Sequence, residues 1–295
     1  MILVVGSTGL VGYEICRQLA SKELPFRAMV RKTSDPKKVE QLQQLGAEIV
    51  YGDLKNPETL TKACMNTDVI IDTASSTLSH REGDNIRTVD EQGQLNMVRC
   101  ASKNRVKQFI YLSFKHDPVN TFPLDEAKRH VEKELKTSGM NYTILSPSFF
   151  MEVWLTPNLV VDYEHYEAKI FGEGKGKMHW ISYKDVAACS VASINNPKVM
   201  NKTIELGGPE GLTPLEVIKL FEQKTHHPFK INTIPRTALE QQRRSATDEL
   251  QASLASLMLQ TDIGDHINPE QAQQIFQIPW TRVSQYINTT ISNKY

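Results

Sequence analysis

The sequence predicts an α/β fold in which helices cover both faces of a parallel β-sheet. Short aliphatic segments alternate with amphipathic helical segments six times between residues 1 and 147, with short connections. A glycine-rich turn joins the first strand to the first helix, and small or polar residues follow several later strands. Because strand–helix–strand crossovers are right-handed, this pattern gives a doubly wound sheet whose ligand crevice lies at the carboxyl ends of the strands.

The individual elements follow from periodicity and from cap residues. Gly46 is placed to end the helix before the third strand, and Asn56-Pro57 to begin the helix after it. Strands are predicted at 1–5, 26–30, 48–51, 68–72, 107–113 and 141–145, and helices at 11–21, 39–45, 58–65, 89–102 and 124–137.

The pattern loosens after Pro147. Thr213 and Glu216 form a predicted capping box for a helix that runs to residue 224. We expect a helix within 181–192, strands at 203–206 and 230–234, and a mainly helical remainder over 238–295. The prediction is therefore a sheet-based domain over 1–150 and a smaller, mainly helical lobe over 151–295 that is interleaved with it.

Composition narrows the classes of partner. Lys and Arg (34) balance Asp and Glu (34), so neither a nucleic acid nor an anionic membrane is expected. The sequence has no apolar run near the roughly 20 residues of a transmembrane helix. The four scattered cysteines suggest a reducing, cytoplasmic setting in which they serve as small core residues.

The strongest motif is the turn that follows the first strand and opens the first helix. Three glycines at this spacing allow a tight turn, a close approach of a pyrophosphate and close helix–strand packing. The alternative is a turn of small residues, but the strand before it, the helix after it and the later alternations favour a Rossmann-type dinucleotide site. The residues of this motif are Gly6, Ser7, Thr8, Gly9, Leu10, Val11 and Gly12.

The second strand is followed by Arg31-Lys32 rather than by the acidic residue that is typical of NAD sites. A guanidinium can bind a 2′-phosphate bidentately, whereas a carboxylate would repel it. We therefore expect NADP(H), the alternative being two solvated basic side chains.

Later strand ends supply further candidate contacts. Asp53 is placed to accept from an adenine amino group and Leu54 to pack on the ring, or Asp53 simply caps the next segment. The small residues Thr73, Ala74 and Ser75 would let the backbone approach the ribose, or they satisfy a turn.

With these residues in view, the sequence resembles the NmrA-like group of atypical short-chain dehydrogenases/reductases. The resemblance rests on the glycine motif and on the segments 30–32, 52–54, 142–147, 149–152, 181–187 and 207–210. It implies a nucleotide domain with a small substrate lobe. It also implies either an NADPH-dependent reductase of quinone-like or isoflavone-like molecules, or a nucleotide-binding regulator of a protein partner.

The resemblance also assigns roles to single residues. Lys128 matches the catalytic lysine of the wider superfamily and Ser113 its serine, and Pro147 and Phe149 fall among the cofactor-binding positions. Leu124 stands where the catalytic tyrosine would be, so no phenol can donate a proton from there. Lys128 would orient the nicotinamide ribose and stabilise a developing oxyanion. The alternative is a solvated lysine on a polar helix.

These features predict an NADPH-dependent oxidoreductase that transfers a hydride to a small quinone-like, enone or aromatic substrate. Two alternatives remain: a non-catalytic NADP(H) sensor that regulates a protein partner, and an assembly factor that keeps the nucleotide for structure. Phe149, Phe150 and Trp154 either wall an aromatic substrate or pack as ordinary core. The loop 172–177 is either a lid or a plain surface loop, and no metal is expected.

Overall fold

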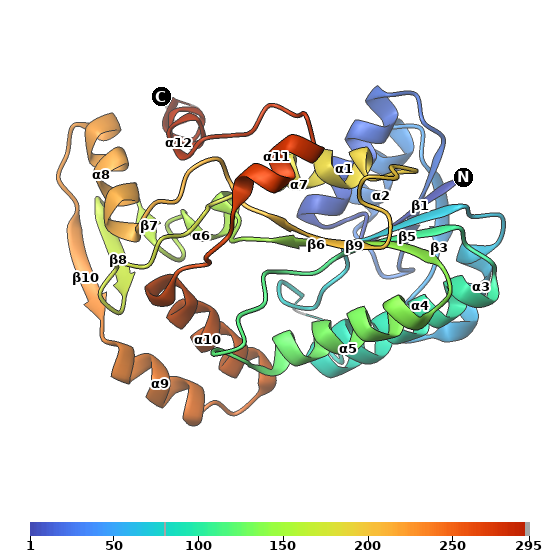
Figure 1. The fold of residues 1–295 in the computed structure, drawn as a ribbon, viewed down its shortest axis with the longest axis horizontal. Helices are drawn as coiled ribbons and strands as arrows, with labels where there is room; N and C mark the ends of the chain where they lie inside the picture. Colours follow the sequence, from blue (N-terminus) through green and yellow to red (C-terminus); the bar gives the residue numbers. More distant parts are fainter. Residues whose placement is uncertain (80, 293–295) are drawn as a thin grey trace. The chain divides into compact units, whose positions relative to one another are not determined.

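The computed structural model describes residues 1–79 and 81–292, and its elements largely follow the predicted alternation (Figure 1). The strands are β1 (Ile2–Val5), β2 (Phe26–Val30), β3 (Glu48–Tyr51), β4 (Val69–Asp72), β5 (Gln108–Leu112), β6 (Asn141–Pro147), β7 (Val161–Asp162), β8 (Glu167–Phe171), β9 (Lys202–Leu206) and β10 (Lys230–Ile234). The helices are α1 (Leu10–Ser21), α2 (Pro36–Gln44), α3 (Pro57–Cys64), the π-helix η1 (Ile86–Glu91), α4 (Gln92–Lys103), α5 (Pro123–Thr137), α6 (Met151–Trp154), α7 (Tyr183–Ala192), α8 (Pro214–Thr225), α9 (Arg236–Arg244), α10 (Glu249–Ile263), α11 (Pro269–Ile275) and α12 (Val283–Ser292).

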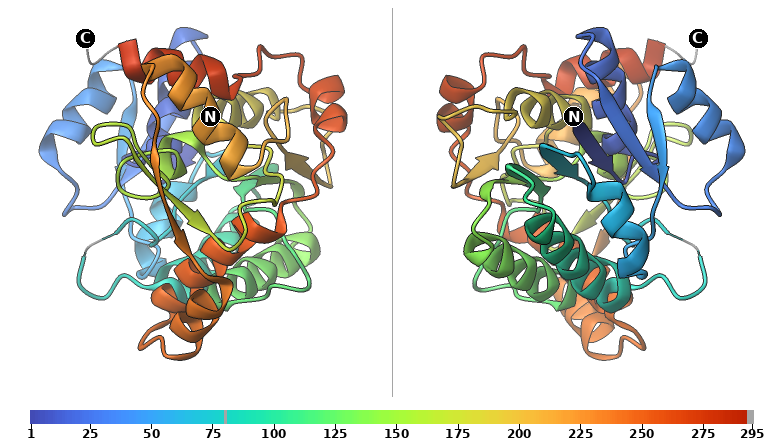
Figure 2. Two further views of the ribbon diagram at one scale, coloured as in Figure 1. Left: turned by 90° about the vertical axis from the view of Figure 1, so that its left-hand side faces the viewer. Right: turned by 90° about the vertical axis from the view of Figure 1, so that its right-hand side faces the viewer.

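Seven strands form one sheet in the order β3-β2-β1-β4-β5-β6-β9. β1 pairs in parallel with β2 on one side and with β4 on the other, so the strand order reverses beside β1. Helices α1 and α2 lie on one face of this sheet, and α4 and α5 lie on the other (Figure 1, Figure 2). This is the doubly wound arrangement that the sequence predicts, and the fold class is confirmed.

The central strands are short and apolar because both of their faces are covered. All four residues of β1 are buried, as are all four of β4, including its last residue Asp72. Parallel sheets with helices on both faces require such continuous apolar runs. The four cysteines are buried too, in agreement with their expected role as small core residues.

Two helical segments begin earlier than their periodicity suggests, since α2 begins at Pro36 rather than at Val39 and a π-helix precedes α4. A helix was expected from Val89, but the chain already turns helical at Ile86, in the π-helix that leads into α4. Asn85 and Thr88 form a capping box in which each side chain accepts from the backbone N–H of the other. Periodicity misses this turn because a capping box needs no apolar residue.

The chain divides into two compact units. The first consists of Met1–Phe114, Pro123–Ser146 and Val186–Ile204, and the second of Lys115–Phe122, Pro147–Asp185 and the residues from Glu205 onward.

Within the first unit, a buried glutamine of β5 fixes the end of α7. The side chain of Gln108 donates to the carbonyl of Ser193 at 2.9 Å and accepts from the backbone N–H of Asn195 at 2.8 Å.

The second unit contains a small sheet that the loosened sequence pattern predicts only in part. β8 pairs in parallel with β10 and antiparallel with β7, but only β10 was expected. Its core includes the fully buried Trp180 and Phe221. The predicted helical remainder breaks into α9 to α12, and its last three residues lie outside the described part of the chain.

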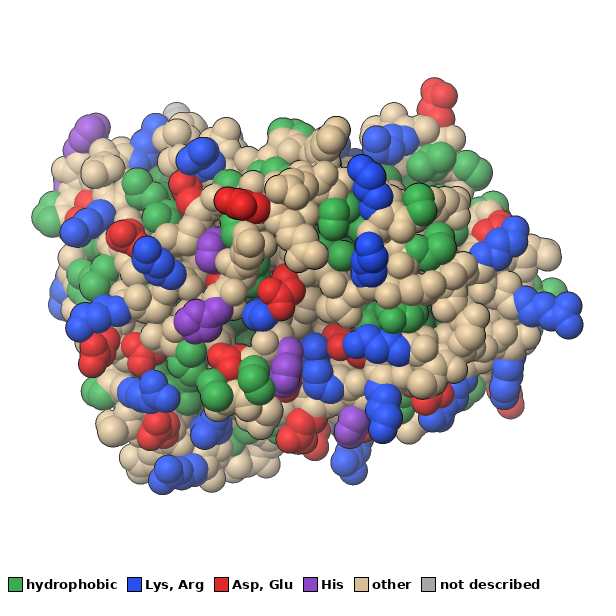
Figure 3. All heavy atoms as spheres, in the orientation of Figure 1, with side chains coloured by type: hydrophobic (Ala, Val, Ile, Leu, Met, Phe, Trp, Pro, Cys, Tyr) green, Lys and Arg blue, Asp and Glu red, His purple; other side chains and the backbone are tan. Residues whose placement is uncertain are grey.

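The distribution of surface charge agrees with the balanced composition. On the face in Figure 3, basic and acidic side chains are interspersed rather than gathered by sign. Within residues 1–79 and 81–292, the helices are all too short or too polar to cross a membrane.

Candidate functional site

The turn between β1 and α1 contains two glycines that the fold itself requires. Gly6 has a φ of +78°, and a Cβ there would lie 2.8 Å from the backbone nitrogen of Ala74. A Cβ on Gly12 would lie 2.2 Å from the carbonyl oxygen of Gly6. A Cβ on Gly9 would lie 3.2 Å from that same oxygen, and its φ is −84°. Packing therefore explains Gly6 and Gly12, whereas Gly9 mainly leaves the approach to α1 open.

The first turn of α1 is suited to an anion. Its N-cap, Gly9, has no side chain to bond the exposed N–H groups of the helix start. Ser7 is fully buried, and its Oγ donates to the carbonyl of Met29 at 2.8 Å, which ties the turn to β2. Lys38 of α2 donates from Nζ to the carbonyl of Thr8 at 3.1 Å and brings a positive charge to the turn. These groups fit the diphosphate of a dinucleotide.

The segment after β4 supports the glycine turn. Thr73 donates from Oγ1 to the carbonyl of Val5 at 3.1 Å, and the N–H of Ala74 donates to Asp72 at 3.0 Å. Ser75 is exposed, with its hydroxyl 3.2 Å from that of Thr77. Small residues are needed here for packing, and their contact with a ribose stays a prediction.

The segment after β3 adopts a tight turn. Asp53 accepts from the backbone N–H of Lys55 at 2.9 Å, as a turn-forming aspartate does. Leu54 is buried in the core of the first unit, where its side chain packs beside Gly93. Asp53 thus forms a turn, whereas Asn56 caps helix α3, and the expected adenine contacts stay predictions.

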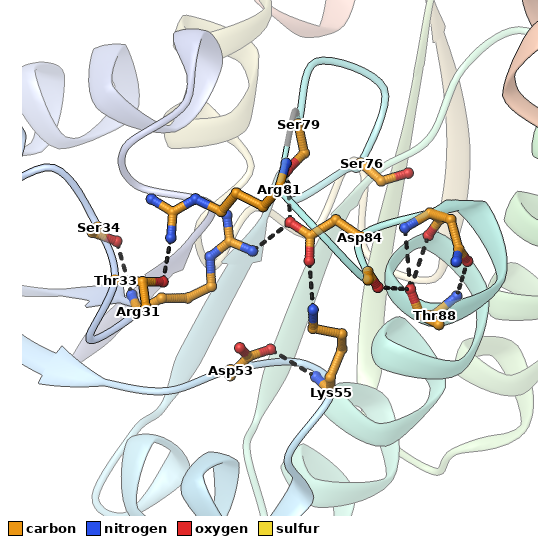
Figure 4. A network of polar contacts seen from close by, with 12 residues as sticks. Arg31, Thr33, Ser34, Asp53, Lys55, Ser76, Ser79, Arg81, Asp84 and Thr88 are labelled. Carbon is orange, nitrogen blue, oxygen red and sulfur yellow. Dashed lines mark hydrogen bonds and ion pairs between the residues drawn. The ribbon is translucent and has the colours of Figure 1, made fainter.

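Arg31 lies in a cluster of charges that Figure 4 shows. Its Nη1 is 2.6 Å from a carboxylate oxygen of Asp84, and Nζ of Lys55 is 2.6 Å from the other oxygen. Ser79 donates to the same carboxylate at 2.6 Å. The Asp84 side chain is only 2% exposed, whereas Arg31 is 32% exposed. Lys32, by contrast, is exposed.

These side chains line a hollow of about 420 Å³. Two of the lining residues, Arg81 and Thr33, are joined by a hydrogen bond from the guanidinium to the hydroxyl. Burial alone would raise the pKa of Asp84, but hydrogen bonds from Lys55, Ser79 and Arg31 lower that pKa to about 2. Asp84 is therefore a carboxylate at any physiological pH. The lining residues are Arg31, Thr33, Asp53, Lys55, Arg81, Glu82 and Asp84.

Lys128 is buried, not solvated on a polar helix. It is 5% exposed, and its Nζ donates to the carbonyl of Leu112 at 3.3 Å and lies 4.9 Å from the ring centroid of Tyr111. Burial lowers its pKa, while the charges of Asp90 and Asp72 oppose that change. The ammonium thus faces two buried carboxylates at the carboxyl end of the sheet.

The polar groups around Lys128 are incompletely bonded to the described protein atoms. One oxygen each of Asp72, Asp90 and Gln94, and the hydroxyl of Tyr111, lack a hydrogen-bond partner among them. Burial raises the pKa of Asp72 to about 6 and raises the pKa of Tyr111 well above its usual value. The Tyr111 phenol is fully buried and cannot replace the tyrosine that is missing at Leu124.

Ser113 is held by the residue that follows Lys128. Nη2 of Arg129 donates to the Ser113 Oγ at 2.8 Å and to the carbonyl of Phe114 at 3.2 Å. Arg129 also pairs with Glu132 at 3.0 Å. Ser113 and Lys128 are therefore both fixed by contacts around the end of β5, and their catalytic role stays a prediction.

Two of the predicted cofactor residues belong to the second unit. Pro147 is buried there, and Phe149 stacks on Trp154 with ring centroids 4.4 Å apart. Both aromatic residues pack with the core of that unit, which agrees with the core alternative. The loop 172–177 is anchored, because the N–H of Glu173 donates to Asp262 at 2.7 Å.

Sequence reasoning missed several charged residues around this site. Lys55 and Lys38 lie in a turn and on an exposed helix, where a single lysine carries no signal. Arg81 and Asp84 lie in the loop between β4 and η1, where the sequence has no hydrophobic periodicity. Only the position of Lys55 directly after Asp53-Leu54 pointed toward the strand end.

Curated relatives match most of the chain. The photosystem II assembly factor Ycf39 of Trieres chinensis is 28% identical over 79% of this chain and 72% of its own length. An NAD(P)H azoreductase of Xenophilus azovorans is 29% identical over 84% of this chain and 80% of its own length.

Solved structures share the fold. An NADPH-dependent quinone oxidoreductase from Escherichia coli, complexed with NADPH, superposes with a TM-score of 0.79 at 19% identity, covering 99% of this chain and all of that one. The model of the NmrA-like family matches residues 1–287. The resemblance noted in the sequence is thus confirmed, and the chain belongs to the NmrA-like family.

Proposed function

We propose that the protein is an NADP(H)-dependent reductase of a small quinone-like, enone or aromatic acceptor. The observation that carries this proposal is the fixed pair of Ser113 and Lys128 at the carboxyl end of β5, in the same unit as the glycine turn. Quinone and azo reductases among the similar proteins support it.

The residues of the first unit fit the nucleotide in separate ways. The uncapped start of α1 beside Gly9 and Lys38 suits the diphosphate, and Arg31 suits a 2′-phosphate. Bound NADPH would supply a hydride from its nicotinamide ring. Lys128 would hold a ribose hydroxyl and favour negative charge on the acceptor oxygen.

Ser113 would donate a hydrogen bond to that oxygen. Arg129 already occupies an acceptor position of the Ser113 Oγ, so the hydroxyl hydrogen is left to point elsewhere. A serine and an ammonium together suit an acceptor that needs charge stabilisation more than a strong acid. The missing phenol at Leu124 argues against reduction of simple carbonyls, which favours quinones and enones.

The experiment is NADPH oxidation by the purified protein against a panel of quinones, enones and azo dyes. Turnover at ordinary enzyme rates, lowered roughly ten- to a hundredfold in the Ser113→Ala variant, would support a reductase. Tight NADPH binding with no turnover of any acceptor would contradict it.

A second candidate function is a nucleotide-binding factor that acts on a protein partner. The similarity to a photosystem II assembly factor favours it, because that likeness covers 79% of this chain. Affinity capture with and without saturating NADPH would distinguish it, since a nucleotide-dependent partner is expected only here. The cytoplasmic setting likewise stays a proposal, supported by the burial of all four cysteines.

A further inference from the structure

Asp84 forms ion pairs with the cations that would bind a 2′-phosphate. Its carboxylate bonds Nη1 of Arg31 and Nζ of Lys55, each at 2.6 Å, and its side chain is almost fully covered. The guanidinium follows β2, the strand end at which dinucleotide sites distinguish the 2′-phosphate from the 2′-hydroxyl. One internal anion thus already pairs with the group expected to select the cofactor.

The hollow around this carboxylate is balanced in charge. Three cations line it, Arg31, Lys55 and Arg81, together with three carboxylates, Asp53, Glu82 and Asp84. Among these acids, Asp84 directly bonds two of the cations, while Glu82 is exposed at the rim. A phosphate dianion entering here would be repelled by the Asp84 charge and would compete for its hydrogen bonds.

We propose that Asp84 is a specificity-determining residue that weakens the preference for a 2′-phosphorylated nucleotide. Its carboxylate occupies the same hydrogen-bond donors of Arg31 and Lys55 that a 2′-phosphate would use. The net binding free energy of the 2′-phosphate is therefore reduced by the cost of breaking these internal ion pairs. The inference rests on the proposed nucleotide site and adds a residue that limits its selectivity.

Neutralising Asp84 should therefore increase discrimination. Asp84→Asn keeps the size of the side chain and removes its charge, leaving both cations for the ligand. We expect the affinity ratio of adenosine 2′,5′-bisphosphate to AMP to rise about tenfold in this variant, which corresponds to about 1.4 kcal/mol. Glu82→Gln is the matched control, since it removes one charge from the same hollow without touching that pairing, and its ratio should change little.

The measurement is calorimetric titration of both nucleotides into wild type and variants, with a thermal melt of each variant. Should Asp84→Asn fold poorly, Asp84→Ser provides the same charge change with a smaller side chain. A complementary variant, Lys55→Met, should lower the ratio because it removes one of the two cations.

The outcomes separate this inference from the proposed function. If both nucleotides bind but the ratio is unchanged or falls in Asp84→Asn, Asp84 orients the cations instead of competing for them, and the inference is wrong. An equal rise in Glu82→Gln would also overturn it, because then only overall charge matters. If neither nucleotide binds wild type, the nucleotide site itself is wrong and the inference falls with it.

Discussion

The guanidinium of Arg129 donates a 2.8 Å hydrogen bond to the hydroxyl oxygen of Ser113. The charge polarises that hydroxyl and fixes its rotamer, so the two residues should act as one unit. In the proposed reaction Ser113 touches the substrate, and Arg129 is a positioning residue.

Replacing Arg129 should therefore mimic the loss of Ser113. We expect Arg129→Met and Ser113→Ala each to lower kcat roughly ten- to a hundredfold, and the double variant to be no slower than Ser113→Ala. Steady-state rates of the three variants give the coupling. Lys133→Met, an exposed charge loss on the same helix, should leave kcat unchanged. Additive losses would refute the coupling.

Lys128 should matter more to turnover than to nucleotide affinity. Removing one preorganised charge that favours an oxyanion costs about 2.7–4 kcal/mol, so Lys128→Met should lower kcat roughly a hundred- to a thousandfold. Lys128→Arg should restore little, because a planar guanidinium does not fit the space of a buried ammonium. Rates are compared with NADPH dissociation constants on folded protein. Wild-type turnover in Lys128→Met would rule out the role.

The glycines of the turn should separate binding from folding. Gly9→Val places a branched side chain at the open approach to α1, so nucleotide affinity should fall more than tenfold while the protein stays folded. Gly12→Val should instead destabilise the fold, because its Cβ would overlap the Gly6 carbonyl. Thermal melts and titrations of both variants test this contrast. Normal binding by Gly9→Val would mean that the diphosphate lies elsewhere.

Arg31 should select the cofactor. Arg31→Ala removes a charge-assisted pair with a phosphate, worth on the order of 1.5–3 kcal/mol. NADPH should then bind roughly ten- to a hundredfold more weakly and NADH almost unchanged. The exposed Lys32 provides the comparison, since Lys32→Ala should have a smaller effect. Equal affinities of wild type for NADPH and NADH would contradict this selection.

Asp72 should make the protein less stable as pH rises through mild acid. Burial raises the pKa of Asp72 to about 6 from 3.8, so between these values the folded state keeps a proton that the unfolded state releases. Stability therefore falls between about pH 4 and pH 6, by at most about 3 kcal/mol. Urea unfolding of Asp72→Asn should show a flatter profile over this window.

A second acid, Asp68, serves as the control that tests whether Asp72 is the group responsible for this pH dependence. Hydrogen bonds from Lys107 and the N-terminus lower the pKa of Asp68 to about 2. Asp68 therefore stabilises the folded state above pH 4, and this stabilisation is lost as the pH falls toward 2. Asp68→Asn should leave the window from pH 4 to pH 6 as in wild type. A flattened profile in both variants would mean that Asp72 is not the group responsible.

Sequence patterns predicted those parts of the fold that depend on local periodicity. The six strands before Pro147 and the glycine turn came from apolar runs and spacing, because strands buried on both faces leave a continuous signal. β7 and β8 left little signal, since one is two residues long and the other mixes charged with apolar residues.

The candidate site was predictable only where one strand end determines it. Arg31 could be found because it directly follows β2. Asp84 could not, because its contacts with Arg31 and Lys55 join residues 53 and 29 positions apart. The burial of Lys128 was equally invisible, since the side chain packs against residues of another element, Tyr111 and Leu112 of β5.

The route of the chain limits how the first unit can be made. This unit includes Val186–Ile204 as well as the N-terminal segments, and Gln108 of β5 bonds the end of α7. During synthesis, more than eighty further residues must therefore be added after β5 before the side-chain amide of Gln108 can form its hydrogen bonds. A fragment ending near residue 150 would lack both α7 and β9, and it should emerge as an aggregation-prone intermediate rather than an independent domain.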